Sequence, residues 1–213
     1  MPSPETEDLA ALARHTQEVY ERNAARFDAE RPKVLFERTW LERFCDGLPA
    51  DGHVLDLGCG TGDPIAAFLR NRGFRVTGLD ASRAMLDLAR RRCPDGDWRF
   101  GDMRTLDLPE RFDGLLAWDS FFHLTAEEQR GCLPRFAAHL RPGGRLLLTV
   151  GPEAGEVEGR VGDDRVYHAS LAPEEYETIL ATHGLRVLRF QPEDPDCGHH
   201  TVLLAQKAGA TVE

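Results

Sequence analysis

The stretch that decides the fold is Val54-Leu55-Asp56-Leu57-Gly58-Cys59-Gly60-Thr61-Gly62. Its first four residues are typical of a buried strand, and the glycines that follow predict a turn opening into a helix. Glycine has no Cβ, so this backbone can approach a ligand closely and adopt positive φ, while a helix N-terminus presents unpaired N–H groups. The stretch therefore predicts a nucleotide-binding turn at the carboxyl end of a strand.

The spacing of the glycines narrows the class of nucleotide. A dinucleotide-binding fingerprint would read Gly-x-Gly-x-x-Gly, but counting from Gly58 the third glycine position is occupied by Asp63. A carboxylate there would face a bound pyrophosphate, which argues against NAD or FAD. A ligand with a cationic centre and no phosphate suits the loop better.

Strands and helices alternate after this turn. Apolar runs predict strands at 75–79, 98–100, 114–117 and 145–150, and helical spacing predicts helices over 65–72, from about 82 onward, and over 126–140. Such alternation predicts parallel strands joined by crossover helices. Asp63 is expected to cap the first helix with Pro64 at its first position, and Thr125 and Glu128 have capping-box spacing.

The flanking segments are less regular. The N-terminal part, over 9–44, predicts two or three helices with a break at Pro32. The C-terminal part predicts an exposed loop or hairpin over 151–164, a strand near 166–168, a helix over 173–183, and strands at 185–190 and 201–205. The alternation from His199 to Leu204 is interpreted as an edge strand.

Composition limits the function classes. The 213 residues include 26 basic and 36 acidic side chains, a net charge of −10, which disfavours attraction to nucleic acid or anionic membranes. The five cysteines are scattered, odd in number and without a Cys-x-x-Cys pair, as in a cytosolic protein with reduced thiols. Residues 1–8 lack the features of a secretory signal, and the apolar run 146–150 is far shorter than the roughly 20 residues of a membrane span. We expect one cytoplasmic domain.

The quoted stretch resembles the first motif of the class I S-adenosylmethionine-dependent methyltransferases. The resemblance covers roughly residues 20–207 and extends to Gly78-Leu79-Asp80, Gly101-Asp102-Met103 and Leu140-Arg141-Pro142-Gly143-Gly144. It implies an α/β fold: a doubly wound, mostly parallel seven-stranded sheet with an antiparallel last strand, helices on both faces and an N-terminal helical cap. The single methyltransferase domain would comprise a cap (1–45), a Rossmann-like core (50–207) and a tail (208–213).

The resemblance also implies a site for S-adenosyl-L-methionine. Asp56 and the glycine-loop backbone would hold its amino-acid end, and Asp80 would accept hydrogen bonds from both ribose hydroxyls, since a carboxylate accepts two donors at once. Asp102 and the Met103 N–H would contact the adenine. The expected cofactor-binding set is Tyr20, Asp56, Gly58, Cys59, Gly60, Gly62, Asp80, Ala81, Met85, Asp102, Met103 and Trp118. Met85 has an alternative interpretation as core filler.

Methyl transfer requires alignment and exclusion of water more than an elaborate catalytic group. A base, where one is needed, should follow the fourth strand, where Asp119 and His123 stand four residues apart. On one helical turn the carboxylate could orient the imidazole and raise its basicity. Two alternatives stay open: His123 as a packing residue, and Asp119 as a helix cap.

A second polar group comprises Tyr167, His168, His199 and His200 and is expected beside the same sheet edge. Cys197 with the last two histidines would suggest a metal, but adjacent histidines on a strand point to opposite faces and no fourth ligand is evident, so no metal is expected. The aromatic residues Phe27, Phe36 and Trp40 either line the acceptor pocket or belong to the core.

The leading functional hypothesis is methylation of a small molecule on O, N or S, giving S-adenosyl-L-homocysteine, by a monomer or homodimer. A protein or RNA methyltransferase is the first alternative. Charge disfavours RNA, and Trp118-Asp119-Ser120-Phe121 stands where an Asn-Pro-Pro-Tyr-like tetrapeptide would be expected. The second alternative is a non-catalytic protein that binds the cofactor.

Overall fold

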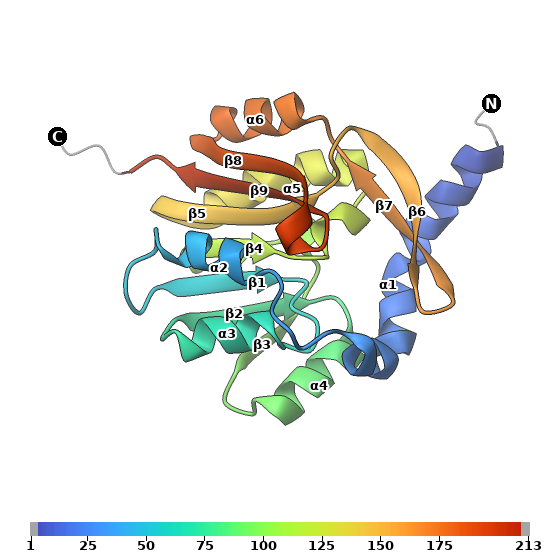
Figure 1. Cartoon of the computed structure of the whole chain (residues 1–213), viewed down its shortest axis with the longest axis horizontal. Helices are drawn as coiled ribbons and strands as arrows, with labels where there is room; N and C mark the ends of the chain where they lie inside the picture. Colours follow the sequence, from blue (N-terminus) through green and yellow to red (C-terminus); the bar gives the residue numbers. More distant parts are fainter. Residues whose placement is uncertain (1–3, 210–213) are drawn as a thin grey trace.

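The computed structural model describes residues 4–209. Its main sheet has seven strands in the order β3-β2-β1-β4-β5-β9-β8 (Figure 1). The strands are β1 His53–Leu57, β2 Arg75–Asp80, β3 Asp97–Phe100, β4 Phe112–Ala117, β5 Leu140–Val150, β8 Leu185–Asp194 and β9 His200–Lys207. The first five are mutually parallel, and β9 runs antiparallel to both of its neighbours. The predicted doubly wound α/β sheet with an antiparallel last strand is confirmed.

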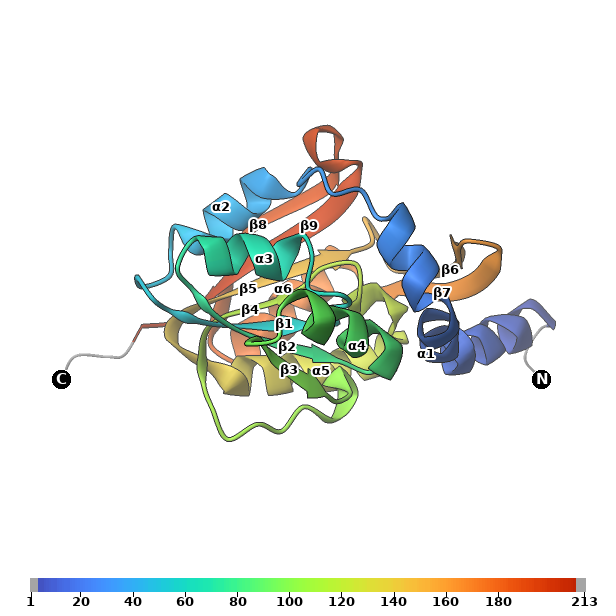
Figure 2. The same cartoon turned by 90° about the horizontal axis from the view of Figure 1, so that it is seen from below.

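Helices cover both faces of this sheet. Their bounds are α1 Pro4–Glu30, α2 Arg38–Cys45, α3 Ile65–Asn71, α4 Arg83–Arg92, α5 Ala126–His139 and α6 Pro173–Thr182, with short 3-10 turns η1 Met103–Thr105, η2 Phe121–His123 and η3 Pro195–Cys197. One buried cluster joins the sheet to α2, α3 and α4, and another joins it to α5 and α6. Figure 2 shows α2 and α3 on one side of the strands and α5 on the other. Among residues 4–209, none of these helices has the length and apolar character of a membrane span.

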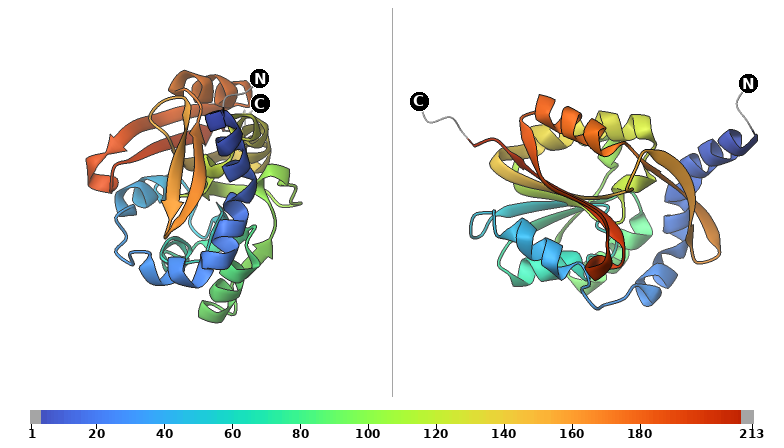
Figure 3. Two further views of the ribbon diagram at one scale, coloured as in Figure 1. Left: turned by 90° about the vertical axis from the view of Figure 1, so that its right-hand side faces the viewer. Right: turned by 45° about the horizontal axis from the view of Figure 1, so that its top comes forward.

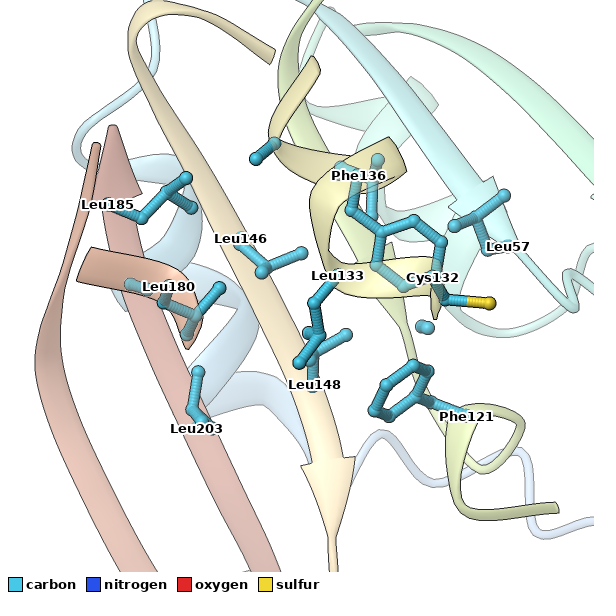
Figure 4. Packing of buried hydrophobic residues seen from close by; sticks show 14 of the residues in the cluster. Leu57, Phe121, Cys132, Leu133, Phe136, Leu146, Leu148, Leu180, Leu185 and Leu203 are labelled. Atoms are coloured by element: carbon cyan, nitrogen blue, oxygen red, sulfur yellow. The ribbon is translucent and has the colours of Figure 1, made fainter. Parts of the chain in front are cut away.

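The helix α5 illustrates how local sequence fixes an element. The Thr125 side chain accepts from the Glu128 N–H, and the Glu128 side chain accepts from the Thr125 N–H, so the predicted capping box is confirmed. The apolar face of α5 then packs on the sheet, where Leu133 and Phe136 lie against Leu146 and Leu148 (Figure 4). Full burial of each such side chain contributes about 1.5–3 kcal/mol, so this face anchors the helix.

Three local predictions were wrong. The strand over 199–204 is not at the edge: β9 lies between β5 and β8, because Val202 to Ala205 form a continuous buried run typical of an interior strand. Asp63 does not cap α3; its carboxylate pairs with Lys33, and Pro64 holds the cap position without a side-chain bond. The strand predicted at 145–150 begins earlier: β5 starts at Leu140 and includes residues 141–144, where its register with β4 shifts.

The remaining elements stand at the carboxyl ends of the parallel strands. Strands β6 Gly155–Val161 and β7 Asp164–Ser170 form a separate two-stranded hairpin, longer than the loop and short strand predicted there. The hairpin lies alongside α1 (Figure 3), where the Tyr167 N–H donates to the Thr16 hydroxyl at 3.0 Å and Asn23 donates to Asp164 at 2.7 Å. The other cap helix, α2, packs on the sheet. Of the predicted tail, residues 210–213 lie outside the described residues.

Candidate functional site

One cavity collects most of the predicted site. It lies at the carboxyl ends of β1, β2 and β4, with α1 forming one wall. Its lining includes the predicted residues Tyr20, Asp56, Gly58, Cys59, Gly60, Asp80, Ala81, Met85, Asp102, Met103, Trp118, Asp119 and His123. Gly62 is the predicted site residue outside this lining. The strand order explains the gathering, because parallel strands deliver their following loops to the same edge of a sheet.

The three glycines of the loop after β1 have different reasons for being glycine. Their φ angles are +70° at Gly58, +55° at Gly60 and +74° at Gly62, a region that favours glycine. A Cβ on Gly58 would lie 2.3 Å from the Ser120 Cβ, and one on Gly62 would lie 2.6 Å from the Trp98 ring. A Cβ on Gly60 would meet nothing within 4 Å. Gly60 therefore presents open backbone to the cavity, whereas Gly62 makes room for packing.

Asp80 is fixed rigidly at the end of β2. Its two carboxylate oxygens accept hydrogen bonds from the backbone N–H groups of Gly60 and Ser82, each at 2.8 Å. Burial raises the pKa of Asp80, and these two bonds oppose that rise. Each oxygen keeps a second lone pair, so the carboxylate can still accept from two ligand hydroxyls.

Asp56 is buried in the cavity wall without a cationic partner at bonding distance. Burial first, and then the nearby Asp80 charge, raise the pKa of its carboxyl to about 7. Its side chain is 3% exposed, and no hydrogen bond to the carboxylate is found within residues 4–209. Buried charges are normally paired, so this site calls for a positively charged ligand group. The ammonium and sulfonium of S-adenosyl-L-methionine meet that need.

Asp102 carries a partner that its motif did not reveal. Arg104 donates to the Asp102 carboxylate from Nε at 2.9 and 3.0 Å and from its own backbone N–H at 2.9 Å. The same guanidinium also pairs with Glu128 at 3.0 Å. The carboxylate is thus held in the cavity wall by η1, and its expected contact with adenine stays a prediction.

The expected pairing of Asp119 with His123 is not found. His123 instead contacts the Tyr20 hydroxyl through Nε2 at 2.8 Å and the Tyr167 carbonyl through Nδ1 at 2.9 Å. A carbonyl only accepts, so Nδ1 carries the hydrogen and Nε2 accepts from Tyr20. Burial lowers the pKa of His123 to about 4. His123 is therefore a neutral ring that positions Tyr20.

Asp119 belongs to a different network. One of its oxygens accepts from Arg31 at 3.0 Å and the other contacts His200 Nε2 at 2.9 Å, while its N–H donates to Thr149. Burial alone would raise the pKa of Asp119, but His200 and Arg31 bring it below its usual value. The Asp119 φ of +50° is unfavourable for a residue other than glycine, as often occurs at functional sites. Asp119 also does not cap η2, which begins without a side-chain bond.

The network continues to both sides. His200 Nδ1 lies 2.9 Å from the Cys197 carbonyl. Because both partners of this ring only accept, both nitrogens carry hydrogens; burial opposes this, but the Asp119 bond and charge raise the pKa of His200 overall. On the other side Arg31 donates to Glu37, whose side chain is fully buried, at 2.9 Å. We name Glu37, Arg31, Asp119 and His200 the charge chain. Sequence reasoning missed its first two members, since no local signal joins them.

A second cavity is linked to the first by side-chain contacts: His200 in its lining contacts Asp119 in the lining of the first. The β6–β7 hairpin and the segment joining β8 to β9 form its walls, together with the end of β5. Its polar and aromatic lining comprises Phe122, Thr149, Glu153, Glu156, His168, Ser170, Glu193, His199, His200 and Thr201. The aromatic residues of the cap divide as the two interpretations allowed: Phe27 lines the first cavity, whereas Trp40 is buried in the core.

Comparison with known proteins agrees with this geometry. Residues 54–144 match the family model described as a methyltransferase domain. Among solved structures, the S-adenosylmethionine-bound amino pentose methyltransferase CalS10 of Micromonospora echinaspora superposes with a TM-score of 0.69 over 88% of this chain and 96% of that one, at 23% identity. DesVI of Streptomyces venezuelae gives 0.64 over 98% and 100%, at 22% identity. These likenesses show the fold.

Over residues 54–144 the chain is thus similar to methyltransferases. Its curated relatives include the O-methyltransferase cnsE of Penicillium expansum, 37% identical over 56% of this chain and 45% of that protein. The cypemycin N-terminal methyltransferase of a Streptomyces species is 36% identical over 63% and 56%. A dTDP-3-amino-3,6-dideoxy-alpha-D-glucopyranose N,N-dimethyltransferase of Streptomyces fradiae is 40% identical over 47% and 40%. The chain thus spans about half the length of these curated relatives.

Proposed function

We propose that this methyltransferase transfers a methyl group from S-adenosyl-L-methionine to a small-molecule acceptor and leaves S-adenosyl-L-homocysteine. One observation carries the proposal. Open glycine backbone at Gly60, the buried carboxylate of Asp56 and the partly buried carboxylate of Asp80 line one cavity at the carboxyl ends of adjacent parallel strands. This combination suits a ligand with a positive centre and a ribose.

Several residues of the first cavity would contact the cofactor. Asp56 and the backbone at Gly60 hold the charged amino-acid end of the cofactor, and Asp80 accepts its ribose hydroxyls. Met85 and Ala81 contact one face of the adenine. When bound, the cofactor supplies a methyl group on a positively charged sulfur, open to in-line displacement. Tyr20 and the rest of α1 cover the site and exclude water.

An amine is the acceptor that the second cavity favours. Three carboxylates, those of Glu153, Glu156 and Glu193, line it, and no lysine or arginine is among its described lining residues. The charge attracts a basic small molecule. Relatives named as N-methyltransferases agree with an amine acceptor, although an O-methyltransferase is also among them.

The location, partners and domain organisation of the protein are also part of the proposal. Five free cysteines support the cytoplasm as its location, because disulfides are rare there. The net charge of −10 supports a protein that does not bind nucleic acid. We further propose that residues 1–213 work as one methyltransferase domain, since α1 lines the cavity formed by the sheet, and that it acts as a monomer or homodimer.

Calorimetric titration with S-adenosyl-L-homocysteine, followed by incubation of cell extract with deuterated-methyl cofactor, tests the function. We expect binding, and label in the small-molecule fraction on an amine. No binding would overturn the proposal. Label in macromolecules would favour the protein or RNA alternative, and tight binding with no labelled product would favour a non-catalytic role.

A further inference from the structure

We propose that His168, on β7, is the catalytic residue that takes the proton from the methyl acceptor. The inference rests on the function proposed above and deepens it. A general base needs a free lone pair within reach of the acceptor.

Three titratable residues near this wall are held by other groups, and the others that line the second cavity, Glu153, Glu156, Glu193 and His199, are exposed. Both ring nitrogens of His123 are occupied, by Tyr20 and by the Tyr167 carbonyl. Both ring nitrogens of His200 carry hydrogens, because they face the Asp119 carboxylate and the Cys197 carbonyl. Each oxygen of Asp119 is bonded to a cation of the charge chain. None of these three residues is therefore free to accept a proton.

His168 differs from them in its environment. Its ring makes no hydrogen bond or ion pair with any residue in the part of the chain that the structure describes, and it lines the second cavity. Burial lowers its pKa, with a smaller opposing effect from Asp119, so the ring is neutral near pH 7. A neutral imidazole always has one nitrogen with an open lone pair.

The structure also fixes where this ring stands. Its centroid lies 4.6 Å from that of Phe122 and 4.9 Å from that of His123, which lines the first cavity. On the neighbouring strand, a Cβ on Gly159 would lie only 2.3 Å from the His168 Cε1. Gly159 therefore leaves the space that the ring fills. His168 thus lines the second cavity and packs against His123, which lines the first.

The proposed step transfers one proton and one methyl group. An ammonium group in the second cavity gives one proton to the open nitrogen of His168, and the electron pair of the broken N–H bond stays on the amine nitrogen. That pair forms the new N–C bond as the C–S bond breaks, and the electrons of the C–S bond go to sulfur. The imidazolium then releases its proton to water, and the nearby Asp119 charge favours the protonated ring while it lasts.

His168→Gln tests the role, with the exposed His183→Gln as the matched control. The probes are S-adenosyl-L-homocysteine for binding and a panel of small primary and secondary amines with deuterated-methyl cofactor for turnover. For His168→Gln we expect kcat to fall roughly 100-fold, which is the lower end of the effect of losing a general base. Its affinity for S-adenosyl-L-homocysteine should stay within about twofold of the wild-type affinity. Added imidazole should partly restore His168→Gly. Turnover of His168→Gln within threefold of wild type would overturn the role.

Two further measurements keep the proposal open to refutation. Gly159→Ala should displace the ring and lower kcat in the wild type, but not in the His168→Gln background. Diethyl pyrocarbonate at pH 7, with peptide mapping, should modify His168 and spare His123 and His200. A protected His168 would overturn the inference without touching the proposed function, whereas loss of S-adenosyl-L-homocysteine binding by the wild type would overturn the function itself.

Discussion

Two regions of this molecule are built in opposite ways. The cofactor side is the wall around Asp80, where we propose that the cofactor binds, and the acceptor side is the wall around Asp119, His123 and His200, where we propose that the acceptor binds. On the cofactor side, Asp80 bonds to Gly60 and Ser82, which lie 20 and 2 residues away in sequence. On the acceptor side, Tyr20 and His123 are separated by 103 residues, and Asp119 and His200 by 81. The first side follows from consecutive strand–loop–helix units. The second depends on where α1, the hairpin and β9 come together.

Removing Arg31 should break the acceptor side most severely. Arg31→Met leaves Glu37 buried without its cation and Asp119 with one partner, which should cost about 3–5 kcal/mol of unfolding free energy. Urea unfolding followed by circular dichroism measures the loss. The double variant Arg31→Met/Glu37→Gln should recover most of it, because the orphaned charge is gone. A loss below about 1 kcal/mol for the single variant would contradict a buried charge chain.

The glycine loop offers a matched pair on the cofactor side. Gly58→Ala should cost about 3 kcal/mol, from positive φ and a collision with Ser120, whereas Gly60→Ala should cost only about 1 kcal/mol from φ. Thermal and urea unfolding compare the two. We expect Gly60→Ala to weaken cofactor binding more than it weakens the fold. Equal stability losses would mean that the open space at Gly60 has no special meaning.

Asp80→Asn tests ligand binding with a side chain of nearly the same shape. Hydrogen bonds to a charged acceptor are worth more than those to a neutral one, and the amide would place an NH₂ group against a backbone N–H of Gly60 or Ser82. We expect affinity for S-adenosyl-L-homocysteine to fall roughly 100-fold, about 2.7 kcal/mol by calorimetry. The exposed Asp95→Asn serves as control and should bind as the wild type does. An unchanged affinity would place the ribose elsewhere.

The smallest expected effect concerns pH and the charge chain. The pKa of His200 is raised in the folded protein, so its stabilising contribution is complete below its unfolded pKa near 6.5 and is lost as pH rises through the folded value. The free-energy difference between wild type and His200→Gln should be about 1 kcal/mol at pH 6 and smaller at pH 9. Asp119 and Glu37 are the charged groups that act on the ring, and both raise its pKa. A difference that grows with pH would show that His200 is neutral.

Much of the cofactor side was predictable because its signals are local. The alternation of apolar runs and turns predicted the parallel strands. Asp56 is the last but one residue of β1 and Asp80 is the last of β2, so their meeting at one cavity followed from topology. The roles assigned to these residues toward the cofactor stay predictions. The capping box at Thr125 was equally local and is confirmed.

On the acceptor side, His168, His199 and His200 were expected beside this sheet edge and line one cavity, but most of the side-chain contacts were not predicted because no local signal joins them. Asp119 was paired with His123 by helical spacing, but η2 is a short turn and the Asp119 carboxylate reaches His200 on β9 and Arg31 after α1 instead. The position of β9 inside the sheet was likewise missed, since alternation in the histidine-containing start outweighed the continuous apolar run that follows. Neither Arg31 nor Glu37 belongs to a motif.

The long helix α1 connects these two sides. Gln17 donates to the Ala81 carbonyl at 2.9 Å on the cofactor side, while the neighbouring Thr16 hydroxyl accepts from Tyr167 of the hairpin at 3.0 Å. Two successive residues of α1 thus bind two separate parts of the molecule, the loop after β2 and the hairpin strand β7. Any displacement of the helix would break both contacts at once, so under the proposed function the release of S-adenosyl-L-homocysteine and the entry of a new acceptor would be coupled through α1.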